Sequence, residues 1–147
     1  MLHRTRNRWL RPGLIVLALQ AVIVGIWALA APQSFYSEFP IVGGSWVNDF
    51  PPYNEHLVRD VGGLYTGFAL LFLWAAVSLE ATLVKAALVS WLPFAGLHLY
   101  FHVTNMAGLE AVEKLLQTGV LGLAFVIPLA LLYAAGKRRN ATFAALR

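Results

Sequence analysis

The sequence predicts an all-α integral membrane protein, folded as a four-helix bundle with an aromatic-rich outer loop between its first and second helices. Three observations predict this class. Only 12% of the 147 residues are charged, whereas an ordinary soluble domain carries about 25%. Four runs contain no Asp, Glu, Lys or Arg, at 12–37, 61–79, 86–109 and 115–136. The basic residues gather near the ends of the chain.

Each uncharged run is long enough to supply a membrane-spanning helix, which needs about 20 apolar residues. The predicted spans are 12–31, 57–79, 83–104 and 111–135, and residues 1–147 form a single transmembrane domain. Pro93 and Pro128 lie inside the last two spans. Because proline leaves a helix carbonyl without its usual donor, we expect a neighbouring group to bond that carbonyl. Without cysteine, the chain has neither disulfides nor thiolate metal sites.

The distribution of charge predicts the orientation. Basic residues flank the first and last spans at Arg4, Arg6, Arg8, Arg11, Lys137, Arg138, Arg139 and Arg147. The positive-inside rule therefore places both termini in the cytoplasm. The expected location is a bacterial inner membrane, with the chain as a multi-pass protein. All acidic residues except Glu80 then lie outside. This pattern indicates a lipid bilayer, not nucleic acid, as the partner of the basic residues.

The first span has an alternative reading. Its basic start and the sequence Ala28-Leu29-Ala30 are similar to a signal peptide with its cleavage site. An uncleaved helix is the preferred interpretation, because the apolar stretch is long for a signal peptide and Pro32 follows closely. The later topology is the same in both cases.

The segment between the first two spans is rich in aromatic residues and prolines. Its aromatic residues are Phe35, Tyr36, Phe39, Trp46, Phe50 and Tyr53. Aromatic side chains favour the membrane–water interface. We expect a folded cap over the outer helix ends; the alternative is a loop that only anchors the protein at the interface.

Polar residues open the second span. Asn54 is a plausible N-cap, while Glu55 and Arg59 are four residues apart, as are His56 and Asp60. This spacing allows an ion pair and a charge-assisted hydrogen bond on one helix.

The same helix face continues through Gly63 and Gly67, a GxxxG pattern that allows a second helix to approach closely. We therefore expect this face to pack against a neighbouring helix and to bury His56 and Asp60.

A second polar group follows in the third and fourth spans. His98 and His102 stack on one face of the third span. Glu113 and Gln117, also four apart, open the fourth. Gln117 lies within the apolar run, where a polar group needs a partner. If the topology is correct, the rings of His56, His98 and His102 lie near the outer end of the bundle.

Three readings of these polar residues stay open. The first is a hydrogen-bonded network that fixes helix packing. The second is a metal site, for zinc or iron, with His98 and His102 as ligands and His56, Asp60 or Glu113 as a third. The third is acid–base chemistry on a lipid or small amphiphile by Glu55, His56 and Asp60.

The segment Pro52-Tyr53-Asn54-Glu55-His56-Leu57-Val58-Arg59-Asp60-Val61-Gly62-Gly63 resembles a type of small bacterial four-helix membrane protein, broadly DoxX-like. The resemblance covers the four-span layout and this motif, and it implies the fold more than a reaction. Some DoxX relatives are linked to quinone-dependent oxidoreductases, but this chain carries no cofactor motif that supports the same role.

The leading functional prediction is a non-catalytic membrane protein: an accessory or structural subunit, or a binder of a small ligand, with a buried His/Asp/Glu cluster at its outer face. Its partners would be the bilayer, a small amphiphile or another membrane subunit. The alternative is a membrane-embedded enzyme or metal-binding protein that uses His56, Asp60, His98 and His102.

Overall fold

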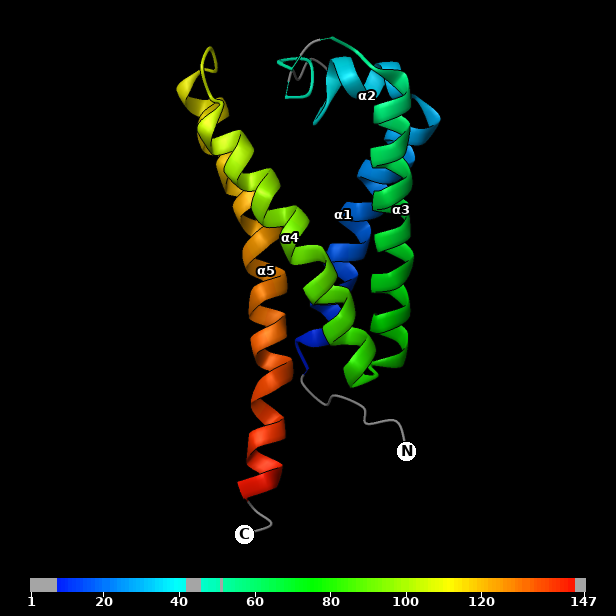
Figure 1. Cartoon of the computed structure of the whole chain (residues 1–147), viewed down its shortest axis with the longest axis vertical. Helices are drawn as coiled ribbons and strands as arrows, with labels where there is room; N and C mark the ends of the chain where they lie inside the picture. Colours follow the sequence, from blue (N-terminus) through cyan, green and yellow to red (C-terminus); the bar gives the residue numbers. More distant parts are fainter. Residues whose placement is uncertain (1–7, 42–45, 51, 145–147) are drawn as a thin grey trace. The chain divides into compact units, whose positions relative to one another are not determined.

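The computed structural model describes residues 8–41, 46–50 and 52–144, the last eight of these by their backbone alone. This part of the chain contains helices and no strand. Figure 1 shows them in chain order: α1 (Leu10–Ala30), α2 (Pro32–Glu38), α3 (Glu55–Ser78), α4 (Ala81–Thr104) and α5 (Ala111–Ala144). The all-α prediction is confirmed for the described residues.

Four of the helices are long and apolar enough to cross a membrane: α1, α3, α4 and the part Ala111–Gly136 of α5. They match the predicted spans, although α1, α3 and α4 each begin slightly earlier than expected and α5 continues beyond the predicted end. The short helix α2 was not predicted. It begins at Pro32, where the fixed φ of proline suits the first turn of a helix.

The turn between α3 and α4 is short and fixed by polar contacts. Leu79 adopts a left-handed backbone, with φ of 51°, and so ends α3. The Arg11 guanidinium donates from Nε to the Ala76 carbonyl at 3.1 Å. Glu80 then caps α4, because its carboxylate accepts the backbone N–H groups of Thr82 and Leu83 at 2.9 and 2.7 Å. These two hydrogen bonds lower the pKa of the Glu80 carboxyl.

The contacts divide the chain into two compact units. Of the described residues, 8–17 and 72–144 form one unit, and those within 18–71 form the other. Helices α1 and α3 each contribute one part to each unit. The four-helix bundle stays a prediction, and each unit is described by itself.

In the first unit, α4 and α5 run side by side (Figure 1). Trp91 of α4 is almost fully buried, and its ring lies edge-on to Phe72 with centroids 5.6 Å apart. Its indole N–H donates to the carbonyl of Ala124 at 3.0 Å. This is the carbonyl that an N–H at position 128 would bond, and Pro128 has none. A neighbouring side chain therefore satisfies the carbonyl freed by Pro128, as expected.

In the second unit, α1 and α3 approach each other closely at two glycines. A Cβ placed on Gly25 would lie 3.1 Å from the Gly62 carbonyl oxygen, and one on Gly62 would lie 2.9 Å from the Leu29 backbone nitrogen. Backbone atoms cannot give way as a side-chain tip can. Glycine at both positions thus allows the two helices to touch.

The close contact between α1 and α3 therefore does not use Gly63 and Gly67, the glycines of the predicted GxxxG pattern. A Cβ on Gly63 or Gly67 would meet nothing within 4 Å. Within residues 18–71, Gly62, one position earlier, occupies the face turned toward α1. Packing of the GxxxG face against another helix stays a prediction.

Candidate functional site

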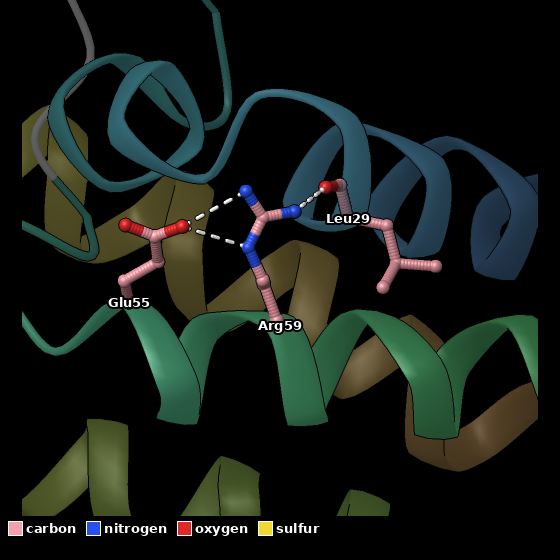
Figure 2. Close-up of polar contacts among 3 residues, drawn as sticks. All are labelled: Leu29, Glu55 and Arg59. Carbon is pink, nitrogen blue, oxygen red and sulfur yellow. Dashed lines mark hydrogen bonds and ion pairs between the residues drawn. The ribbon is translucent and has the colours of Figure 1, made fainter.

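The beginning of α3 is held by local polar contacts. The Asn54 side chain accepts the backbone N–H of Leu57 at 3.1 Å, which confirms Asn54 as an N-cap. Arg59 pairs with Glu55 at 2.8 Å and also donates to the backbone carbonyl of Leu29 in α1. Figure 2 shows the guanidinium between these two acceptors. Arg59 thereby joins the start of α3 to the end of α1.

His56 and Asp60 form the second predicted pair on α3. Nε2 of His56 lies 3.3 Å from Oδ2 of Asp60. The two side chains are 87% and 55% exposed. The predicted burial of this pair is therefore not found within residues 18–71. An exposed His–Asp pair is open to solutes and adds little to stability.

In the other unit, aromatic and imidazole rings form a ladder along one face of α4. Phe94 stacks on His98, with ring centroids 5.3 Å apart and an interplanar angle of 16°. The centroids of the His98 and His102 rings are 4.6 Å apart. Both imidazoles are half-buried. The predicted pairing of these two histidines is therefore present.

Gln117 of α5 completes this cluster from the facing helix. It is the one polar or charged residue that is fully buried among the described residues, with 1% exposure. Its side chain makes a hydrogen bond with the His102 imidazole. The other end of its amide, Nε2, has no hydrogen-bond partner within the described part of the chain. One end of the Gln117 amide therefore has the hydrogen-bond partner that a polar group in an apolar run needs.

Glu113 has a different role from the one predicted for it. Its Oε2 accepts the backbone N–H of Glu110 at 3.0 Å, an arrangement that satisfies a donor at the start of α5. Across 8–41, 46–50 and 52–136, no group of three or more His, Cys, Asp and Glu side chains could hold a metal ion. His98 and His102 therefore have no third ligand of these types there.

The predicted site residues lie in both units. Asn54, Glu55, His56, Arg59 and Asp60 belong to residues 18–71, and His98, His102, Glu113 and Gln117 belong to the other unit. The gathering of all three histidine rings at one end of the bundle stays a prediction.

The sequence did not predict two further contacts. Phe94 precedes His98 by four residues, so the helical spacing that paired the histidines could also have found it. In the other unit, Gln20 makes a hydrogen bond with the buried Tyr65 hydroxyl. A glutamine within an apolar run was the available signal, as it was for Gln117.

Comparison with known proteins adds no relative: no family model, no curated protein and no solved structure matches the chain.

Proposed function

We propose that this chain is a non-catalytic integral membrane protein, an accessory subunit or small-ligand binder, whose α4–α5 pair is joined by a polar cluster. The cluster consists of His98, His102 and Gln117. The observation that carries the proposal is the burial of Gln117 and its hydrogen bond to His102 on the facing helix. A buried amide in an apolar helix is costly unless it is bonded, so this pair favours one arrangement of the two helices.

The lipid bilayer is the partner best supported by the exposed side chains. Large apolar residues remain exposed on the membrane-length helices, among them Val77, Leu97 and Leu115 at 72%, 70% and 74%. Such surfaces are unfavourable in water and ordinary in lipid. With the charge distribution, they support a multi-pass inner-membrane protein with cytoplasmic termini. The DoxX-like resemblance remains part of this proposal.

A membrane-embedded enzyme or metal-binding protein that uses His56, Asp60, His98 and His102 is the second candidate. The His56–Asp60 contact favours it, because a carboxylate beside an exposed imidazole can tune proton transfer to a solute. Acid–base chemistry on a small amphiphile would then take place at the start of α3.

A double-mutant cycle tests the cluster. Gln117→Leu, His102→Leu and the double variant are unfolded in mixed detergent micelles and followed by circular dichroism. The Gln117–His102 coupling should be about 0.6 kcal/mol, the average measured for hydrogen bonds between membrane helices, and at most about 1.7 kcal/mol. A parallel cycle of Gln117→Leu with His56→Leu should show no coupling, since His56 is exposed. Equal values in both cycles would contradict the proposed role of the cluster.

A further inference from the structure

We infer that His98 and His102 bind a late first-row transition-metal ion, with Gln117 as the positioning residue. This inference rests on the small-ligand-binding role proposed above and specifies the class of ligand. Two features carry it: the geometry of the two imidazoles and the hydrogen bond that His102 makes with Gln117 of the facing helix.

The two imidazoles are placed to share one ion. They lie on successive turns of α4, on the same face, with ring centroids 4.6 Å apart. Histidines four residues apart on a helix can bind one ion together, with metal–nitrogen distances of about 2.0–2.1 Å for zinc. The stack on Phe94 limits rotation of the His98 ring. Little side-chain freedom is therefore lost when His98 binds an ion.

Gln117 determines how His102 presents its ring. Because Nε2 of Gln117 has no partner, its hydrogen bond to the imidazole uses Oε1 as the acceptor. The ring N–H of His102 then donates to that oxygen, which leaves the lone pair of a neutral imidazole on the other nitrogen. Metal-binding histidines commonly donate their second N–H to an oxygen acceptor, which fixes the tautomer and the ring orientation.

The remaining ligands follow from the residues present. The described residues provide no third His, Cys, Asp or Glu beside the pair, so water or another oxygen ligand completes the coordination shell. Imidazole ligands suit zinc, copper, nickel and iron, whereas magnesium and calcium prefer oxygen ligands. The two imidazoles therefore favour zinc, copper, nickel or iron over magnesium and calcium.

The experiment is a metal titration of the full chain. The protein is purified in mild detergent with an affinity tag that contains no histidine, freed of metal, and titrated with Zn²⁺ and Co²⁺. We expect about one ion per chain and a Co²⁺ absorption band typical of nitrogen ligands. His98→Phe retains the stack on Phe94 and removes one ligand, and we expect its affinity to fall at least tenfold. Gln117→Leu removes the oxygen that accepts the His102 ring N–H, a loss that typically costs about 10- to 100-fold in affinity.

The matched control is His3→Ala/His56→Ala, which removes the other two histidines of the chain and leaves both proposed ligands. Its affinity should equal that of the unaltered protein. Loss of binding in this control, or unchanged binding in His98→Phe, overturns the site. Absence of binding in the folded, unaltered protein also overturns it, and a measured Gln117–His102 coupling would then leave the packing role intact. Binding without that coupling would support the metal site and contradict the packing role.

Discussion

Glu80 shows how a single carboxylate organises the turn between α3 and α4. It accepts two backbone N–H groups at the start of α4, and these bonds lower its pKa from the ordinary 4.5. The charged form is therefore favoured in the folded chain. Its stabilising contribution is complete at a pH above the unfolded pKa and disappears as the pH falls through the lowered folded value.

We therefore expect Glu80→Ala to destabilise the protein at pH 7 and to have a smaller effect in acid. Thermal unfolding of the unaltered protein and the variant, measured in detergent from pH 7 downward, checks this. The difference in melting temperature should shrink once the pH passes below about 4.5, the ordinary carboxyl value. A difference independent of pH would show that charge on Glu80 has no part in the cap.

The residue scale also shows which contacts a sequence can predict. The Asn54 cap and the Glu55–Arg59 pair were predicted correctly, because both join residues close along one helix. The hydrogen bond from Arg59 to the Leu29 carbonyl and the hydrogen bond between His102 and Gln117 each join two different helices. The spacing of residues along the chain does not predict which residues of two different helices will bond.

At the scale of helices, two adjacent glycines in α3 have opposite surroundings. Gly62 faces the backbone of α1, while a Cβ on Gly63 would meet nothing within 4 Å. Alanine at Gly62 therefore tests the steric cost of contact with α1. Alanine at Gly63 tests helix propensity alone.

We expect Gly62→Ala to destabilise the protein by about 1–3 kcal/mol, because the added methyl group collides with backbone atoms of α1. Gly63→Ala should be neutral or stabilising by up to about 1 kcal/mol, because alanine favours the helix. Unfolding of both variants in mixed micelles compares them. If Gly63→Ala were the more damaging, the face of α3 toward Gly67 would be the one in contact with a helix.

The proline in α5 and the tryptophan in α4 form a second pair whose coupling can be measured. Trp91→Phe retains an aromatic ring but removes the donor to the Ala124 carbonyl. An unsatisfied buried carbonyl costs about 1–3 kcal/mol. Pro128→Ala restores a backbone N–H to that carbonyl. In unfolding experiments, Pro128→Ala should therefore recover part of the stability lost in Trp91→Phe, and additive losses would contradict this account.

At the scale of the whole molecule, the apolar faces and the charges determine how the chain meets a membrane. Four helices are long enough to cross, and their exposed surfaces are apolar. The proposed orientation places Asp49 and Ala107 outside and Thr82 inside. All three side chains are exposed in the structure.

Since the chain has no cysteine, single introduced cysteines test this orientation cleanly. A membrane-impermeant maleimide should label Asp49→Cys and Ala107→Cys in spheroplasts, and it should label Thr82→Cys only after the membrane is broken. The opposite labelling pattern would reverse the orientation and place both termini outside.

The sequence by itself determined the helical class, the four membrane-length segments and the local pairs on α3 and α4. These depend on apolar length and on spacing along one helix, which a linear sequence records directly. Only the tertiary structure decided that Gly62 rather than Gly63 contacts α1, that Trp91 bonds the carbonyl freed by Pro128, and that Gln117 reaches His102. Each of these depends on how one helix is rotated against another. A rotation by one residue turns a different face toward the neighbour while leaving the apolar pattern almost unchanged.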